Sequence, residues 1–346
     1  MIHAHQMNKA IYFLLFITVL SCTKQHSQTE KVQNKRNKIT HVHDKIKEIK
    51  IEDVLISNIS RLYLMDNFLI IGDYKPQDKQ IHLFDKNTFE YITSSTYQGQ
   101  GPGEITIMGC IGTDAKNRRF FVSDHGKQKI FCYDLDSVLA NPLYEAKEKT
   151  GMNARLFPDK YYYINDTLSI ALIIEPTGDF GFNQSVAKWN MNTGDIHILK
   201  YKHPDITQKR VNIAVSPEKN LYVECYSYHD LMSIFNLNGD LITNVYGPNW
   251  KKDKTKDSYY GDIIFCKEHI LALYSGKKTF IKDDVKGIKT NLPTQLIAFD
   301  IGGNYIRTLD IGYNISSFCY DESNNRLLFV FDDEIQFGYL VLDDTI

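Results

Sequence analysis

Apolar and polar residues alternate along most of the chain in short segments that come in pairs. The clearest pair covers residues 120–136, FFVSDHGKQKIFCYDLD, where two apolar runs flank a tight polar turn and the second ends in an aromatic residue and an acid. Strict alternation over about four to eight residues is typical of a half-buried β-strand. We therefore expect two antiparallel strands here. The same pattern recurs at 68–85, 168–190, 220–236, 270–300 and 327–343.

Equivalent positions in the six copies are evenly spaced. Intervals of about 48 to 57 residues separate them, which is the range of the blade repeats of a β-propeller. Polar turns precede each pair, and a hairpin signal with a further strand follows most pairs, as in NTGDIHILKY and NLNGDLITNVY. Each unit is therefore predicted to hold four strands. The equivalent positions are Asp73, Asp124, Leu172, Cys225, Tyr274 and Phe331.

Six such units predict an all-β fold, a six-bladed β-propeller of four-stranded antiparallel blades. Radial packing of the blades covers their apolar faces and leaves only short edges. The last unit reaches the end of the chain before it can form an outer strand. The segment IKEIKIE at 46–52 has no other partner, so we predict that it closes the last blade as its outer strand.

The N-terminus has the features of a targeting signal. Residues 10–20 form a continuous apolar run that is shorter than the roughly 20 residues of a transmembrane helix and fits the core of a signal peptide. The following Val19, Leu20, Ser21 and Cys22 resemble a bacterial lipobox, which implies lipidation of Cys22. An ordinary signal peptide and a buried N-terminal strand are the alternatives. We expect a signal peptide over 1–21, a lipidated flexible tether over 22–44 and the propeller over 45–346.

Composition narrows the function classes. With a formal net charge of −2, nothing argues for a nucleic-acid surface, and no nucleic-acid partner is expected; the 12% of aromatic residues favour strands. The cysteines other than Cys22 show no C-x-x-C pair, so a zinc site is not expected, and we interpret them as buried free thiols. These five are Cys110, Cys132, Cys225, Cys266 and Cys319.

Two segments resemble known propeller families. Val122, Asp124, Lys129, Ile130 and Tyr133 occupy the places of the NHL-type pattern, with Lys129 where Arg is usual. The segment GQGPGE at 99–104 resembles the GxGPGE signature of TolB-like six-bladed propeller lipoproteins common in Bacteroidetes. The resemblance implies a propeller fold and an envelope location, either periplasmic or on the cell surface, with the outer membrane as the expected anchor. It implies no reaction.

A candidate ligand site follows from strand order. Connections between blades share one face of a propeller with the turns between second and third strands, and that face is usually the functional one. Glycines at 99–104 allow positive φ and close backbone approach, and rim aromatics can stack on a sugar or a peptide side chain. Simple blade crossing and capping of blade cores are the structural alternatives. The candidates are Gly99, Gly101, Gly103, Glu104, Tyr74, His125, Phe180, Phe182, Tyr226, Tyr228, His229 and Phe280.

The insertion at 275–293 also lies on this face. It is basic and polar, so we expect it to be exposed and mobile. It fits either a partner-binding flap or a tolerated insertion.

No catalytic motif stands out. The chain has no G-x-S-x-G elbow and no H-E-x-x-H helix. Six-bladed lactonases bind calcium with acids and amides around the channel, but Asp73 and Asp124 have no acidic counterparts in the other four blades. We expect these two acids to cap turns. No catalytic residue, metal or cofactor is therefore assigned.

The favoured function is an envelope-anchored binding module. Its expected partners are the membrane, through a lipid on Cys22, and an envelope protein, a peptide or a glycan. A propeller hydrolase or lyase of the lactonase type is the alternative, and a sensor or scaffold for an envelope complex is a third hypothesis. An enzyme should converge acids, amides or histidines on one channel mouth, whereas a scaffold should expose a flat apolar patch.

Overall fold

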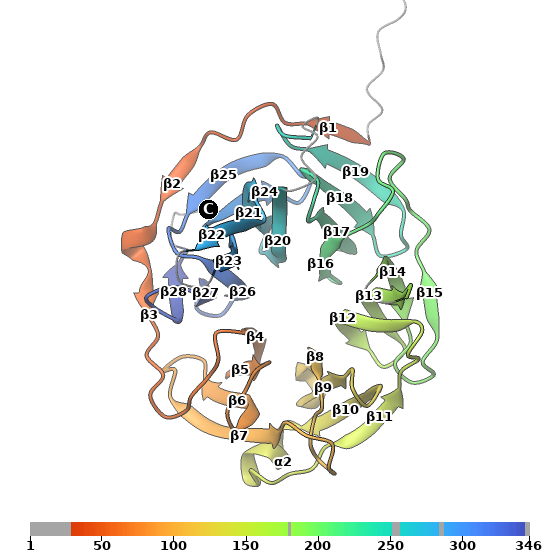
Figure 1. The fold of residues 1–346 in the computed structure, drawn as a ribbon, viewed down its shortest axis with the longest axis vertical. Helices are drawn as coiled ribbons and strands as arrows, with labels where there is room; N and C mark the ends of the chain where they lie inside the picture. The colour runs from red at the N-terminus through yellow and green to blue at the C-terminus, as the bar shows by residue number, and fades with distance from the viewer. Residues whose placement is uncertain (1–28, 179–180, 251–256, 284–286, 343–346) are drawn as a thin grey trace, which may run out of the picture.

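The computed structural model describes residues 29–178, 181–250, 257–283 and 287–342, and these form a ring of six β-sheets (Figure 1). The predicted six-bladed β-propeller is confirmed. Within each blade neighbouring strands pair in antiparallel fashion. The signal peptide, Cys22 and Phe180 lie outside the described residues.

Each of the first three blades runs in chain order from an inner strand at the channel to an outer strand at the rim. Blade 1 contains β4 (Ser60–Met65), β5 (Phe68–Asp73), β6 (Lys79–Asp85) and β7 (Tyr91–Tyr97). Blade 2 contains β8 (Met108–Asp114), β9 (Arg119–Asp124), β10 (Lys129–Asp134) and β11 (Lys147–Gly151). Blade 3 contains β12 (Phe157–Asn165), β13 (Leu168–Pro176), β14 (Phe182–Trp189) and β15 (Ile196–Ile198).

The second half of the ring repeats this inner-to-outer arrangement. Blade 4 contains β16 (Val211–Ser216), β17 (Leu221–Tyr226), β18 (Leu231–Asn236) and β19 (Leu241–Tyr246). Blade 5 contains β20 (Asp257–Cys266), β21 (His269–Lys278), β24 (Gln295–Asp300) and β25 (Tyr305–Asp310). Blade 6 contains β26 (Ile315–Asp321), β27 (Arg326–Phe331), β28 (Phe337–Val341) and β3 (Lys47–Glu48).

The hydrophobic core lies between the blades. In the described part of the chain it divides into six clusters, and each cluster joins two neighbouring blades. The cluster containing Leu69 of β5 and Leu328 of β27 links the first blade to the last. Every residue of β27 is buried because both faces of this middle strand pack against other blades. Apolar packing therefore continues around the whole ring.

The N-terminal segment closes the last blade, as predicted. Lys47 and Glu48 of β3 pair antiparallel with Tyr339 and Gly338 of β28. Next to them, the Ile49 amide donates to the Phe337 carbonyl at 2.9 Å. Chain segments from both ends thus complete one sheet.

Residues 29–44 depart from the flexible tether expected over 22–44. β1 (Glu30–Val32) pairs in parallel with β19, and β2 (Ile39–His41) pairs in parallel with β25. Figure 1 shows β1, β2 and β3 following one another along the outer rim of the ring. We call residues 29–45 the strap. Its composition is polar because backbone pairing with the open edges of outer strands needs few apolar side chains.

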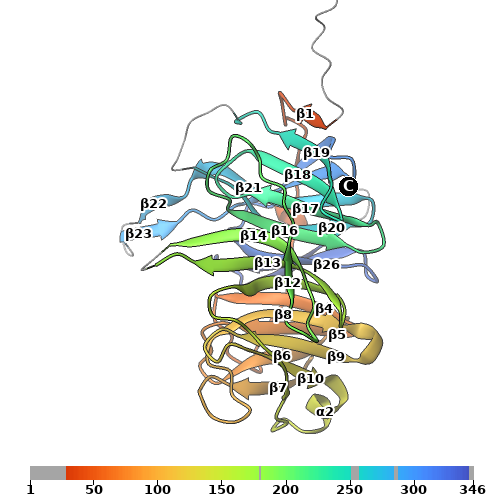
Figure 2. The ribbon, with the colours of Figure 1, turned by 90° about the vertical axis from the view of Figure 1, so that its right-hand side faces the viewer.

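Two insertions depart from the plain blade pattern. The short helix α2 (Leu135–Ala140) follows β10, and the Asp134 side chain caps it by accepting from the Ser137 amide at 2.8 Å. Between β21 and β24, β22 (Phe280–Asp283) and β23 (Gly287–Thr290) form a hairpin that extends past the blades in Figure 2. Within the described ranges, no helix has the length and apolar character needed to cross a membrane.

The five cysteines in the described residues are free thiols. Cys110, Cys225 and Cys266 are buried as expected, whereas Cys132 and Cys319 are half-buried. They therefore serve mainly as small packing residues.

Candidate functional site

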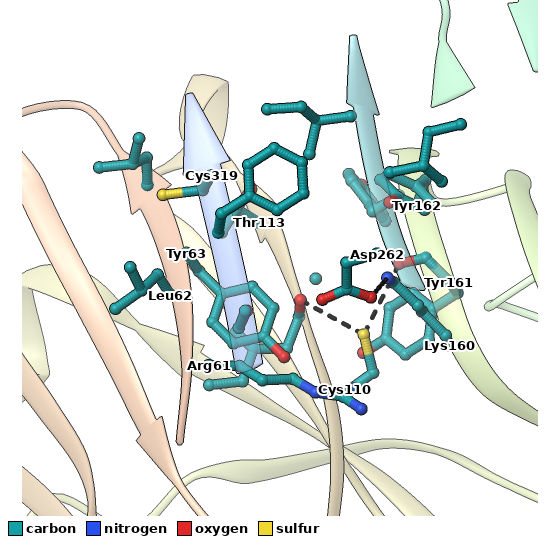
Figure 3. Close-up of a pocket in the computed structure, with 18 residues that line it drawn as sticks. Arg61, Leu62, Tyr63, Cys110, Thr113, Lys160, Tyr161, Tyr162, Asp262 and Cys319 are labelled. Atoms are coloured by element: carbon teal, nitrogen blue, oxygen red, sulfur yellow. Dashed lines mark hydrogen bonds and ion pairs between the residues drawn. The ribbon is translucent and has the colours of Figure 1, made fainter. Parts of the chain in front are cut away.

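The inner strands enclose a cavity of about 220 Å³ on the propeller axis (Figure 3). Side chains from β4, β8, β12, β20 and β26 line it. The inner strand of each blade lies next to the axis, so side chains of these strands border the central space. This channel cavity contains charged groups among its apolar walls.

A partly buried ion pair crosses the channel cavity. Lys160 Nζ of β12 lies 3.2 Å from Asp262 Oδ1 of β20, and Figure 3 shows the two side chains directed at each other. Burial alone would raise the pKa of Asp262, but the Lys160 ammonium and the Arg61 guanidinium outweigh burial and hold it below its ordinary value. Burial alone would lower the pKa of Lys160, and the Asp262 carboxylate raises it instead. Both groups are therefore charged at neutral pH.

Arg61 of β4 stands beside this pair without an acid of its own. Its guanidinium lies over the Tyr74 ring, 5.2 Å from the ring centroid. The Tyr74 hydroxyl in turn donates to the Gly109 carbonyl at 2.6 Å and lies 3.0 Å from the Tyr63 hydroxyl. Within the described residues Arg61 makes no hydrogen bond or ion pair, although its side chain is exposed to the channel. Its guanidinium donors are therefore available to a ligand.

A second cavity of about 180 Å³ adjoins the first at the loop face of blades 3 and 4. We call it the mouth cavity. Arg61 and Lys160 line both cavities, so the two are continuous. Asp159, Arg210 and Tyr228 also line it. Tyr228 is 47% exposed, in the turn between β17 and β18.

Arg210 is fixed by its neighbours. Its guanidinium lies 3.8 Å from the centroid of the Phe182 ring and donates to the Phe182 carbonyl at 2.9 Å. It also donates to the Lys209 carbonyl at 2.7 Å. Stacking and two carbonyl bonds hold this cation at the edge of the mouth cavity.

The structure brings three of the predicted aromatic residues to this region. Tyr74 contacts Arg61, Phe182 holds Arg210, and Tyr228 lines the mouth cavity. His125 packs against Phe157 at the start of β12, with ring centroids 5.3 Å apart. The buried Nε2 of His125 has no hydrogen-bond partner among the described residues.

Other predicted residues lie elsewhere. Tyr226 is buried in the core between blades 3 and 4, and His229 packs against Trp250. Phe280, which is 63% exposed, lies on the β22–β23 hairpin. None of these three lines the channel cavity or the mouth cavity.

The glycine-rich loop at 99–104 is closed by its own contacts. Glu104 Oε2 accepts from the Gly101 amide at 2.7 Å, and Lys127 Nζ donates to the Gly101 and Glu104 carbonyls, both at 2.8 Å. A Cβ atom at Gly99 would clash with Glu104 Oε2, and Gly103 has φ of +69°. Close approach and positive φ therefore explain these glycines structurally.

The acids Asp73 and Asp124 cap turns, as expected. The Asp124 carboxylate accepts from the backbone amides of Thr106, Ile107, Gly126 and Lys127. The Asp73 carboxylate accepts from the amides of Ser57 and Lys75. Both carboxylates tie a blade-to-blade connection to the turn after a second strand.

A larger groove of about 450 Å³ lies between β14, β15 and the segment that leads to β16. Of the charged residues that line it, Lys209 pairs with the buried Glu224 at 2.6 Å. Both charges of that pair are satisfied.

The charged residues of the inner strands are absent from the candidates that the sequence suggests. Arg61, Lys160 and Asp262 lie in runs that resemble ordinary apolar strands, such as KYYYI at 160–164. The sequence feature that could have identified them is a charged residue within a predicted inner strand. In a propeller, such a residue faces either a blade core or the channel. Among the described residues, no group of three or more His, Cys, Asp or Glu side chains is arranged to hold a metal ion.

Comparisons with solved structures agree with this architecture. A member of the DUF4221 family from Bacteroides vulgatus has 10% identity and a TM-score of 0.56, covering 86% of this chain and 98% of its own. A Bacteroides fragilis protein named as exported has 10% identity and a TM-score of 0.52, with 90% and 98% covered. The calcium-binding protein regucalcin from Agrobacterium tumefaciens has 9% identity and a TM-score of 0.55, with 88% and 95% covered. These identities show a shared fold alone.

Sequence comparison identifies the family. No curated protein matches the chain. The DUF5128 family, described as a 6-bladed beta-propeller, matches residues 24–264. This match spans more than half of the chain and agrees with the six blades in Figure 1. The protein therefore belongs to the DUF5128 family of six-bladed β-propellers.

Proposed function

We propose that the protein is a binding module of the bacterial cell envelope and that its ligand binds in the mouth cavity. The observation that carries the proposal is the continuity of the two cavities at Arg61 and Lys160. Polar groups from blades 1, 3 and 4 thereby converge on one concave site. A concave site with a few convergent polar groups is the usual form of a ligand site.

The envelope location rests on the N-terminus and on the fold. The apolar run at 10–20 and the lipobox-like residues before Cys22 support a signal peptide over 1–21 and a lipid anchor. The fold shared with an exported Bacteroides fragilis protein and the GQGPGE segment support a TolB-like or NHL-like envelope propeller. An envelope protein, a peptide or a glycan is the proposed partner.

A hydrolase or lyase that uses the channel is the second candidate. Asp159, Gln184 and Asn212 place one acid and two amides on the mouth cavity. The fold is also shared with regucalcin and a luciferin-regenerating enzyme.

However, Arg61, Lys160 and Arg210 line the same cavity and would repel a divalent cation there. Burial also raises the pKa of the Cys110 thiol, which disfavours a thiolate nucleophile. Binding therefore remains the favoured function.

The experiment is a calorimetric screen of the purified protein with short peptides and soluble glycans. Replacing Tyr228 with Ala should weaken a ligand found in the screen about fivefold, the loss of roughly 1 kcal/mol of aromatic contact. Tyr97→Ala is the matched control, because Tyr97 is 43% exposed and belongs to an outer strand. Equal affinities for the wild type and Tyr228→Ala would contradict the proposed site.

A further inference from the structure

The ionisable groups around the mouth cavity do not all have partners. Lys160 is paired with Asp262 at 3.2 Å, and Arg210 is held by two carbonyls and the Phe182 ring. Arg61 and Asp159 have no ion-pair or hydrogen-bond partner for their side chains among the described residues, and both line the mouth cavity. Among the described residues, one unpartnered cation and one unpartnered anion therefore face the same space.

The Arg61 guanidinium is held in an orientation that suits carboxylate binding. Its guanidinium rests on the Tyr74 ring, and Tyr74 is itself fixed by its hydrogen bond to the Gly109 carbonyl. A guanidinium held in this way presents a planar fork of donors that matches the two oxygens of a carboxylate. No described residue accepts a hydrogen bond from that fork.

Asp159 reaches the cavity through an irregularity of β12. The pairing of β12 with β13 steps from Pro158 to Lys160, which leaves Asp159 as the extra residue of a β-bulge. Bulges redirect a side chain and are common beside functional sites. The half-buried Asp159 carboxylate makes no hydrogen bond to a described residue, and no described Lys or Arg nitrogen lies within 4.0 Å of it.

These two charged groups share a cavity without pairing with each other. Arg61 and Asp159 line one cavity, yet their charged atoms are more than 4.0 Å apart, since they form no ion pair. Leu172 and Tyr228 supply apolar and aromatic surface in the same cavity. A volume of about 180 Å³ accommodates a small molecule.

The charges also restrict its class. A dianionic phosphate would meet the carboxylates of Asp159 and Asp262, and a divalent cation would meet Arg61, Lys160 and Arg210. A zwitterion satisfies both leftover charges at once.

We infer that the mouth cavity binds a small zwitterion of the α-amino-acid type, with its carboxylate on Arg61 and its ammonium on Asp159. The ligand side chain packs against Leu172 and Tyr228. This inference rests on the proposed binding function and specifies the ligand class of the same site.

The test is isothermal titration of the full chain with each of the twenty amino acids, in phosphate buffer free of amines and carboxylates. The best ligand is then compared with the matched acid that lacks its amine and the matched amine that lacks its carboxylate. At least one amino acid should bind saturably, and each matched compound should bind at least about tenfold more weakly, because each loses one charge-assisted contact.

Variants separate the two ends of the ligand. Arg61→Gln should weaken the amino acid and the matched acid at least about tenfold, and Asp159→Asn should weaken the amino acid without weakening the matched acid. If Arg61→Gln does not fold, Arg61→Lys replaces it in the test. This variant keeps the positive charge without the planar fork of donors, so it should weaken amino-acid binding by an intermediate amount. Arg155→Gln and Asp205→Asn are the matched controls, since both side chains are exposed and line neither the channel cavity nor the mouth cavity.

Two outcomes would overturn the inference. One is amino-acid binding that is unchanged in Arg61→Gln and Asp159→Asn. The other is the absence of amino-acid binding alongside Tyr228-dependent binding of a peptide or glycan, which would leave the proposed binding function standing. If the wild-type protein bound no ligand of any class at the mouth cavity, both the inference and the proposed binding function would be contradicted.

Discussion

Arg36 of the strap donates from Nη1 to Asp230 Oδ1 in blade 4 at 2.9 Å, and both side chains are almost fully buried, at 5% and 0% exposed. The Arg36 guanidinium also lies over the rings of Tyr260, Tyr274 and Phe299, between 5.3 and 5.8 Å from their centroids. A buried charge that loses its partner is strongly destabilising. The strap is therefore attached to the interface of blades 4 and 5 by more than backbone pairing.

Replacing Arg36 with Met should destabilise the protein by about 3 kcal/mol, because Asp230 would keep its buried charge without a cation. The Tyr274 hydroxyl and the Asn249 amide still donate to Asp230, and this limits the loss. Urea unfolding followed by fluorescence measures the difference. Lys35→Met is the control, because Lys35 is exposed on the same segment. Similar stabilities of the two variants would show that Arg36 does not anchor the strap.

The Lys160–Asp262 pair predicts a pH-dependent contribution to stability. Folding lowers the pKa of Asp262, so its contribution is complete above the unfolded carboxyl pKa of about 4 and is lost as pH falls through the lower folded value. Asp262→Asn leaves Lys160 unpaired and should cost about 3 kcal/mol at pH 7. The free-energy gap between wild type and variant should shrink below about pH 4.

Urea unfolding at a series of pH values from about 3 to about 7, spanning the carboxyl titration, tests this. Tyr97→Ala is a control without a charge change, and its difference from the wild type should stay constant. A gap for Asp262→Asn that is equally constant across the series would mean that the ion pair contributes nothing to folding.

The proposed lipid anchor predicts where the protein partitions. Changing Cys22 to Ser should move the protein from the membrane fraction into the soluble fraction, because a lipid on this cysteine would be its attachment to the bilayer. Cys132→Ser removes a half-buried free thiol and should leave the distribution unchanged. Membrane partition of the Cys22 variant equal to that of the wild type would contradict the lipid anchor.

The repeat pattern predicts the blades because each blade buries apolar side chains of its strands against the neighbouring blades in the same way. Positions equivalent to Asp73 and Asp124 recur once in each second strand, and their spacing counts the units. Counting strands also places 46–52 in the last blade, since an incomplete sheet needs an edge strand. These inferences depend on apolar periodicity, which sequence shows directly.

The strap and the channel depend on features that periodicity does not show. β1 and β2 pair through their backbones, so Glu30–Val32 and Ile39–His41 carry no apolar pattern. Arg36 pairs with Asp230, which lies 194 positions away in the chain. At the channel, the bulge at Asp159 shifts which side chains of β12 face the axis, and no local rule predicts that shift.

The central claim is that the mouth cavity is the ligand site, and hydrogen–deuterium exchange of the full chain with and without its ligand tests it most directly. Bound ligand should slow exchange at the starts of β4 and β12 and at residues 210–212 and 227–228, which surround that cavity. Slower exchange confined to the β22–β23 hairpin or to the groove beside β15 would contradict this claim.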